Sequence, residues 1–170
     1  MKKIIQVVIA VYLLSIPLIV SGQTAPNIKI TMLDGKKTTL NQLLETGPIL
    51  IDFWATWCVP CKKEMKYLDQ FHREYAKDGF QVLTINQDTP RSLSKVKSYI
   101  RSKKYKFLVA VDPNQQIANK LNAVVLPTTI MVDQKGKITW RHQGYLPGDE
   151  KEIEKQIIAV LNQTTTARDK

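Results

Sequence analysis

Apolar and polar residues alternate along the chain in blocks that predict strands and helices in turn. Nearly continuous apolar runs at 49–54, 80–85 and 107–111 are typical of strands that are buried on both faces. The first two runs are each followed by apolar residues at helical spacing. This spacing predicts one helix that ends at Asp78-Gly79 and another that follows Pro90.

Shorter elements flank this central part on both sides. Before it, two short strands at 28–32 and 37–39 surround the turn Asp34-Gly35, and residues 40–44 form one helical turn. After it, a short helix around Ile117 precedes strands at 128–132 and 138–142, and a last helix spans 149–162 before a polar tail at 163–170. The alternation predicts an α/β domain with a mostly parallel sheet, covered by helices on both faces and carrying an antiparallel hairpin at one edge.

The first 22 residues have the pattern of a secretory signal. Met1-Lys2-Lys3 precedes an apolar run at 4–20, and the small residues Ser21-Gly22 suit cleavage before Gln23. A retained membrane anchor is the alternative, since the run is only slightly shorter than the about 20 residues of a spanning helix. In either case, residues 23–162 are predicted to form one domain in an oxidising space, periplasmic or otherwise extracytoplasmic.

The formal net charge of +10 does not indicate a nucleic-acid-binding protein. The basic residues are scattered over predicted helical surfaces, whereas a nucleic-acid-binding face needs a basic stripe with readout residues. The sequence also contains no nicotinamide- or flavin-binding motif. We therefore expect neither a nucleic acid partner nor a bound cofactor.

Both cysteines of the chain lie in one short motif, Cys58-Val59-Pro60-Cys61. A disulfide across two residues closes a tiny loop and constrains the unfolded chain little, so the pair is a poor structural staple. Structural zinc needs four ligands, and the chain adds only His72 and His142, without finger spacing. Covalent haem would need a histidine where Lys62 stands. The hypothesis that remains is a redox-active disulfide that opens and closes.

The position of the pair at a helix start predicts different roles for the two cysteines. Pro60 is tolerated in a first helical turn, so Val59 can be the first helical residue and Cys58 the N-cap. The sulfur of Cys58 then faces the N–H of Cys61 and the positive end of the helix, which favour a thiolate. Cys58 is thus the predicted nucleophile and Cys61 the resolving thiol. Val59-Pro60 adds no charge and no donor, which favours a reductant over an oxidant.

Two carboxyl groups are candidate catalytic residues that handle protons for this pair. Asp52 interrupts the most buried predicted strand six residues before Cys58, so burial should raise its pKa. The alternative for Asp52 is a surface position at the strand end. Glu64 lies three residues after Cys61 on a neighbouring helical position. The alternative for Glu64 is an exposed helical acid among lysines.

Two segments of the chain resemble a known family. Residues 52–61, Asp-Phe-Trp-Ala-Thr-Trp-Cys-Val-Pro-Cys, resemble the active-site segment of thioredoxins, and Leu126-Pro127-Thr128 resembles their cis-proline loop. The leading Ala25-Pro26 with its hairpin, the extra helix and strand at 87–111, and Glu64 are similar to the extracytoplasmic TlpA/ResA/CcmG-type branch. The resemblance covers the chain from Ala25 to about Leu161. It implies a thioredoxin fold, with a central mixed sheet, helices on both faces, an N-terminal β-hairpin and an inserted helix and strand.

The same resemblance implies a function. The branch contains membrane-anchored or secreted thiol-disulfide reductases, which often serve cytochrome c maturation. Disulfide-containing client proteins, apocytochrome c among them, and a membrane electron donor are therefore the expected partners of a monomer. Many members of the branch carry a different residue at the place of Asp52, which in thioredoxin assists the resolving cysteine. A general periplasmic thioredoxin and a dedicated apocytochrome reductase thus both stay open.

The resemblance also implies a client-binding surface. Pro127 would be cis, and the backbone of Leu126 would pair with a bound client strand. Trp57, Val59 and Pro60 would lie beside the reacting sulfur as the apolar part of this surface.

Two other functions stay open from the sequence. Some secreted relatives with the same inserted elements reduce peroxides, but a peroxidase would need a lone peroxidatic cysteine with an arginine and a threonine around it. A non-catalytic module would hold client proteins or a metal ion without turnover. The function that the residues favour is reduction of protein disulfides by the Cys58–Cys61 pair.

Overall fold

A computed structural model describes residues 23–168 of the chain. The predicted signal segment at 1–22 lies outside the described residues, as do the last two residues of the predicted polar tail. Within 23–168, no helix has the length and apolar character that crossing a membrane requires.

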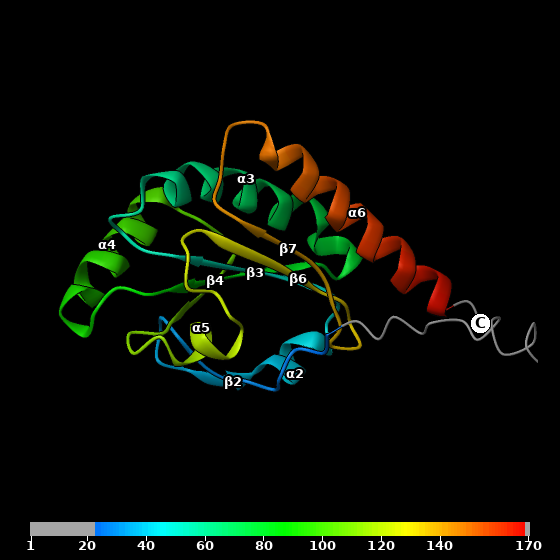
Figure 1. Ribbon diagram of the computed structural model, residues 1–170, viewed down its shortest axis with the longest axis horizontal. Helices are drawn as coiled ribbons and strands as arrows, with labels where there is room; N and C mark the ends of the chain where they lie inside the picture. The colour runs from blue at the N-terminus through cyan, green and yellow to red at the C-terminus, as the bar shows by residue number, and fades with distance from the viewer. Residues whose placement is uncertain (1–22, 169–170) are drawn as a thin grey trace, which may run out of the picture.

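Helices cover both faces of a central sheet (Figure 1). Their bounds are α2 Leu40–Leu44, α3 Val59–Tyr75, α4 Leu93–Lys103, α5 Gln116–Lys120 and α6 Asp149–Arg168, with short 3-10 helices at Ala76–Asp78 and Pro90–Ser92. Gly79 follows the first of these 3-10 helices with a left-handed φ of 84°, as its predicted role as a stop requires. The predicted end of the last helix at Asn162 is wrong. Helix α6 continues to Arg168, since no Gly or Pro interrupts residues 163–168.

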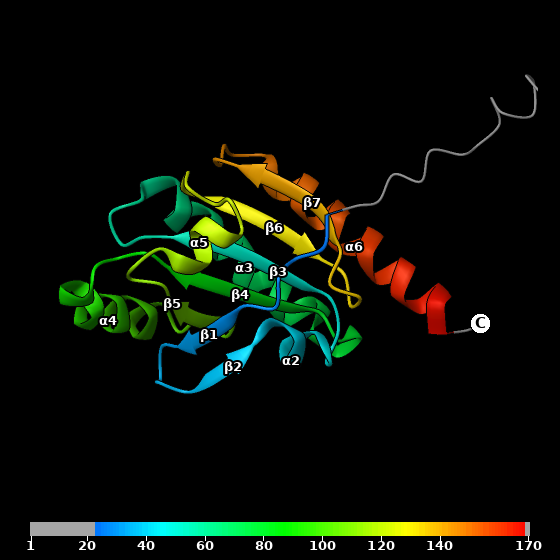
Figure 2. The same ribbon diagram turned by 60° about the horizontal axis from the view of Figure 1, so that its bottom comes forward.

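Seven strands form one sheet in the order β2-β1-β5-β4-β3-β6-β7 (Figure 2). Their bounds agree with the predicted strands to within one residue: β1 Lys29–Met32, β2 Lys37–Thr39, β3 Ile49–Trp54, β4 Gln81–Asn86, β5 Leu108–Val111, β6 Thr128–Val132 and β7 Ile138–Gln143. Strands β3, β4 and β5 run parallel to one another, and the other neighbours pair antiparallel. This confirms an α/β fold with a central mixed sheet.

The prediction of a mostly parallel sheet with one edge hairpin is wrong, because hairpins close both edges. Parallel neighbours need a long crossover connection. The chain provides one between β3 and β4 through α3, and one between β4 and β5 through α4. Tight turns join β1 to β2 and β6 to β7, so these pairs are antiparallel.

Strand β3 shows how the sheet divides the core into two layers. Ile49, Ile51 and Phe53 pack on the side covered by α2 and α5, which we call the α5 side. Leu50 and Trp54 pack on the side covered by α3, α4 and α6, which we call the α3 side. Because side chains alternate along a strand, Asp52 points to the α3 side.

The first described residues lie at the end of the sheet at which strand β3 begins. Ile138 donates its N–H to the carbonyl of Gln23, and Ala25 donates to the carbonyl of Gly136, both at 2.8 Å. The turn between β6 and β7 lies at this end of the sheet because Ile49, the first residue of β3, pairs with the last residue of β6. Strand β3 finishes with Trp54 at the opposite end of the sheet, and the cysteine pair follows there.

Candidate active site

The turn after β3 places Cys58 at the start of α3. Val59 is the first helical residue and Cys58 is the N-cap, as predicted, with φ of −77° and ψ of 104°. Pro60 lies in the first turn, where its missing N–H leaves no intrahelical bond unmade. The N–H of Cys61 therefore points at the sulfur of Cys58, at an N–Sγ distance of 3.3 Å.

The two cysteines differ in their exposure to solvent. They form a disulfide with Cα atoms 5.4 Å apart. Cys58 is 4% exposed, whereas Cys61 is fully buried in the core of the α3 side. The first turn of α3 carries no acidic residue, so the positive end of the helix acts on Cys58 without local opposition.

Apolar residues lie on both sides of Cys58 in the chain, and Leu126 packs on the same core cluster. Trp57 is 67% exposed and Val59 is 58% exposed. The Leu126–Pro127 peptide bond is cis, as the resemblance implied. Leu126 packs against the core cluster that contains both cysteines. The Leu126–Pro127 loop lies at the same end of the sheet as the cysteines, because Thr128, the first residue of β6, pairs with Phe53 near the end of β3.

Asp52 is fully buried on the α3 side, which contradicts its alternative as a surface residue at a strand end. Among the described residues, neither of its carboxylate oxygens has a hydrogen-bond partner. Burial raises the pKa of Asp52 well above its usual value, and the nearby carboxyl of Glu64 raises it further. Asp52 is thus a buried acid that favours its protonated form.

Glu64 is also fully buried, although it lies on a helix among lysines. The hydroxyl of Thr129 donates to its Oε1 at 2.8 Å, and its Oε2 has no partner among residues 23–168. Burial raises the pKa of Glu64 to about 7, the hydrogen bond from Thr129 opposes this rise, and the charge of Asp149 adds to it. The alternative of an exposed helical acid is therefore wrong.

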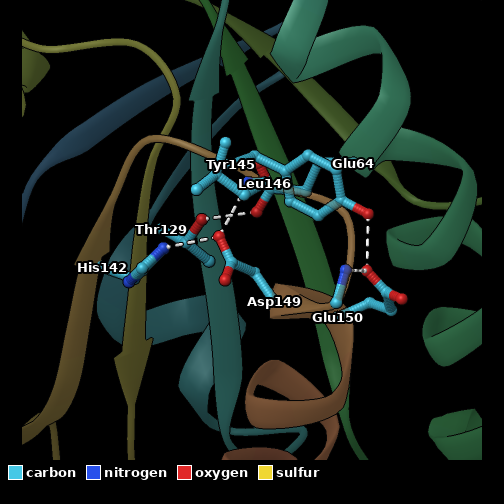
Figure 3. A network of polar contacts seen from close by, with 8 residues as sticks. Glu64, Thr129, His142, Tyr145, Leu146, Asp149 and Glu150 are labelled. Atoms are coloured by element: carbon cyan, nitrogen blue, oxygen red, sulfur yellow. Dashed lines mark hydrogen bonds and ion pairs between the residues drawn. The ribbon is translucent and has the colours of Figure 1, made fainter.

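The loop between β7 and α6 covers Glu64, as Figure 3 shows. Asp149, the first residue of α6, accepts a hydrogen bond from the N–H of Leu146 at 2.8 Å and contacts Nε2 of His142 at 3.2 Å. The Tyr145 hydroxyl donates to Glu150 at 2.6 Å. These contacts hold the loop over the buried acid, which explains how an acid among lysines becomes desolvated.

The two histidines take structural positions. Nδ1 of His72 accepts the backbone N–H of Val82 at 3.3 Å, and burial lowers the pKa of His72. Nε2 of His142 contacts Oδ2 of Asp149. Among the described residues, no group of three or more histidine, cysteine, aspartate or glutamate side chains is arranged to hold a metal ion.

Sequence reasoning missed two polar residues that lie near the cysteine pair or its two carboxyl groups. Thr129 pairs directly with Asp52 across β3 and β6, and it is the hydroxyl that contacts Glu64. Asp88 lies two residues beyond β4 and contacts the turn before Cys58. The position of Asp88 at the carboxyl end of a central parallel strand is a signal that could have identified it.

The arrangement suits thiol-disulfide exchange. A sulfur at a helix N-terminus can react as a thiolate, and a buried second sulfur can displace whatever binds the first. A carboxyl with a pKa of about 7 can take up and release a proton near neutral pH.

Comparisons with known proteins agree with this geometry. The family model described as Redoxin matches residues 20–157. The chain is 35% identical to thiol-disulfide oxidoreductase ResA of Bacillus thuringiensis (strain Al Hakam) over 117 residues, which cover 69% of this chain and 66% of that protein. It is 30% identical to ResA of Bacillus subtilis (strain 168), covering 69% and 64%. The matched segment thus spans slightly less than two thirds of these relatives.

The structure is similar to that of a putative thiol:disulfide interchange protein DsbE from Chlorobium tepidum. The two share a TM-score of 0.76 and 29% sequence identity, over 82% of this chain and 96% of that chain. This similarity confirms the thioredoxin fold that the sequence resemblance implied.

Proposed function

Because the chain belongs to the Redoxin family, we propose that it is a thiol-disulfide oxidoreductase that reduces disulfides of client proteins outside the cytosol. The observation that carries the proposal is the asymmetric pair at the start of α3, with the sulfur of Cys58 at the helix N-terminus and Cys61 fully buried in the first turn. The similarity to proteins named thiol-disulfide oxidoreductase ResA supports the reaction class. The signal-like pattern of residues 1–22 supports the location.

The first step of the proposed reaction forms a mixed disulfide. The Cys58 thiolate attacks one sulfur of a client disulfide, the client S–S bond breaks, and the second client sulfur leaves as a thiolate. The N-terminus of α3 and the N–H of Cys61 stabilise the attacking thiolate. The apolar side chains of Trp57, Val59 and Pro60 and the backbone of Leu126 beside cis-Pro127 bind the client around this bond.

The second step releases the client. The Cys61 thiol loses its proton to the carboxyl pair of Asp52 and Glu64, and the resulting thiolate attacks Sγ of Cys58. The mixed disulfide breaks and the client sulfur leaves as a thiolate, which takes up a proton. Two electrons have then passed to the client, and the product is the Cys58–Cys61 disulfide that the structure contains.

The cycle closes when an external dithiol donor re-reduces this disulfide. A membrane protein is the proposed donor, since an extracytoplasmic thiol pair has no access to cytosolic reductant. The proposed clients are either disulfide-containing proteins in general or apocytochrome c in particular. Because Val59-Pro60 adds neither charge nor donor between the cysteines, we propose that the pair is a reductant. A measured reduction potential near −270 mV supports this direction, and one near −120 mV indicates an oxidant instead.

Replacing the resolving cysteine tests the proposal. The reduced Cys61→Ser variant should trap a disulfide-containing test protein as a mixed disulfide through Cys58, visible as a mass increase that a reductant reverses. The double variant Cys58→Ser, Cys61→Ser is the matched control and should trap nothing. A non-catalytic binding module would hold the test protein equally with and without Cys58, and this outcome would rule out the proposed reaction.

A peroxide assay separates the remaining alternative. A peroxidase would consume hydrogen peroxide with the dithiol as electron source, and the Cys61→Ser variant would form a sulfenic acid at Cys58 as rapidly as a dedicated peroxidatic cysteine does. We expect slow, unspecific oxidation by peroxide, together with rapid exchange with protein disulfides.

A further inference from the structure

The carboxyl end of β4 contacts the turn that carries Cys58. Strands β3 and β4 are parallel and pair Trp54 with Asn86, so the residues that follow each strand also lie side by side. Gln87 donates its N–H to the carbonyl of Trp54 at 2.9 Å, which continues the pairing by one residue. Asp88 is the next residue of this segment, and it lies beside Thr56.

The carboxylate of Asp88 accepts three hydrogen bonds, two of them from the turn. Its Oδ2 accepts the backbone N–H of Thr56 at 2.7 Å, and its Oδ1 accepts the Thr56 hydroxyl at 2.8 Å. The side-chain amide of Asn86 donates to Oδ2 at 2.7 Å, and the N–H of Asp88 donates to Oδ1 of Asn86 at 3.1 Å. Hydrogen bonds to an ionised acceptor are stronger than neutral ones. Asp88 is only 7% exposed, so water competes little for these bonds.

Thr56 is the residue through which this contact can reach the reacting sulfur. It lies two residues before Cys58, in a turn in which the N–H of Cys58 donates to the carbonyl of Ala55 at 3.1 Å. The turn leads the chain from the end of β3 to α3 and places Cys58 at the N-cap, where its backbone is extended. A turn that is free to move would take Sγ of Cys58 away from the N-terminus of α3.

We propose that Asp88 is a positioning residue for thiol-disulfide exchange, because its carboxylate fixes the Thr56 turn and thereby holds the Cys58 sulfur at the N-terminus of α3. This inference rests on the proposed function and adds a residue that does not touch the reacting atoms. The neighbouring Gln87 connects the same segment to the loop that precedes Leu126 and Pro127. Its side-chain amide donates to the carbonyl of Ala123 at 3.3 Å, three residues before Leu126.

The chain offers a matched control for this role in Asp112. Asp112 is also buried and also accepts three hydrogen bonds, from the N–H groups of Gln116, Ile117 and Ala118 at 2.8–2.9 Å. These bonds hold α5, on the other side of the sheet from the cysteines. A loss of stability at Asp112 should therefore leave the reactivity of Cys58 unchanged.

The test measures the pH dependence of Cys58 alkylation by iodoacetamide in the reduced full chain, with the modified peptide identified by mass spectrometry. Thr56→Val removes one donor and keeps the charge of Asp88, so it reports on positioning alone. We expect the midpoint to move to higher pH and the rate at pH 7 to fall about two- to fivefold, the size of a lost helix-terminus interaction. Thr56→Ser should restore the wild-type profile, and Asp112→Asn should retain it.

Asp88→Asn gives a second, independent reading. Removing a negative charge would by itself lower the pH midpoint of Cys58, whereas a loosened turn raises it. A raised midpoint in both Thr56→Val and Asp88→Asn supports the positioning role. An unchanged midpoint in Thr56→Val, a lowered one in Asp88→Asn, or an equal shift in Asp112→Asn contradicts it. Because alkylation needs no client, these outcomes are independent of whether the wild type reduces protein disulfides.

Discussion

The two sides of the sheet treat a buried carboxyl group in opposite ways. On the α5 side, Asp112 accepts three backbone N–H groups and fixes the start of a helix. On the α3 side, Asp52 is equally buried, yet neither of its oxygens has a partner among the described residues. An unsatisfied buried polar group costs about 1–3 kcal/mol. The α3 side therefore gives up stability at Asp52, to which we assign a role in proton transfer, whereas the α5 side satisfies its buried acid.

The first prediction tests whether the α5 side contributes stability alone. Ile130 packs on the α5 side of β6, next to Thr129 on the α3 side. Ile130→Ala should lower the free energy of unfolding by about 2–5 kcal/mol and leave the pH profile of Cys58 alkylation unchanged. Ile130→Val is the graded control, with a loss of about 0.5–1.5 kcal/mol. A changed alkylation profile would show that the two layers are not independent.

The second prediction concerns the pH dependence that Glu64 confers. Its pKa is about 7 in the folded protein and 4.5 as the reference value, so between these values the folded state binds the additional proton. Stability should therefore fall as pH rises from about 4.5 to about 7, by roughly 3 kcal/mol. Urea unfolding of the oxidised protein measures it, because disulfide-bonded cysteines do not titrate.

Glu64→Gln is the control for this pH dependence. The variant keeps an acceptor for Thr129 and removes the Glu64 titration, so its stability should fall less steeply with pH over the same interval than that of the wild type. The lowered pKa of His72 acts in the opposite direction and is common to both proteins. Asp52 is also present in both, so the difference between them isolates the contribution of Glu64. A parallel pair of curves would contradict the buried position of Glu64.

The third prediction reverses the usual sign of a core substitution. Asp52→Leu replaces an unsatisfied acid by an apolar group in an apolar layer, so stability at pH 7 should rise by about 1–3 kcal/mol. Client release should become slower, because the carboxyl pair that takes up the Cys61 proton in the proposed reaction loses one of its members. Unfolding curves and the lifetime of the mixed disulfide measure the two effects. Asp112→Leu is the matched control and should lower stability instead.

The fourth prediction has the smallest effect. Thr129→Val keeps the shape of the side chain and removes its donor to Oε1 of Glu64, at a cost of about 1 kcal/mol. Because this hydrogen bond favours the ionised carboxylate, its loss should raise the pKa of Glu64 further. The lower end of the pH-dependent stability loss should stay in place while its upper end moves to higher pH. An unchanged curve would mean that the hydroxyl does not act on the carboxyl.

The features that could be predicted from the sequence are those that short segments determine. The N-cap position of Cys58 follows from Pro60 two residues later, and the burial of Asp52 follows from the apolar residues on both sides of it. Glu64 was ambiguous because its burial depends on a loop some 80 residues later in the chain, held by Tyr145 and Asp149.

The remaining features depend on which strands become neighbours. The antiparallel placement of β6 beside β3 sets Thr129 opposite Asp52, and no local pattern in either strand indicates this pairing. The contact between Asp88 and Thr56 likewise exists only because β3 and β4 are adjacent and in register. The position of Asp88 just beyond a central parallel strand marks it as a candidate, but its contact with Thr56 follows only once β3 and β4 are known to be neighbours.

The end of the sheet at which Gln23 lies has a practical consequence. The hydrogen bond between Gln23 and Ile138 fixes the first described residues at one end of the sheet, and Cys58 lies at the other end. A surface, electrode or resin attached through a linker at Gln23 should thus present the dithiol outward. Immobilised protein could then exchange electrons with large substrates in solution without obstruction from its own support.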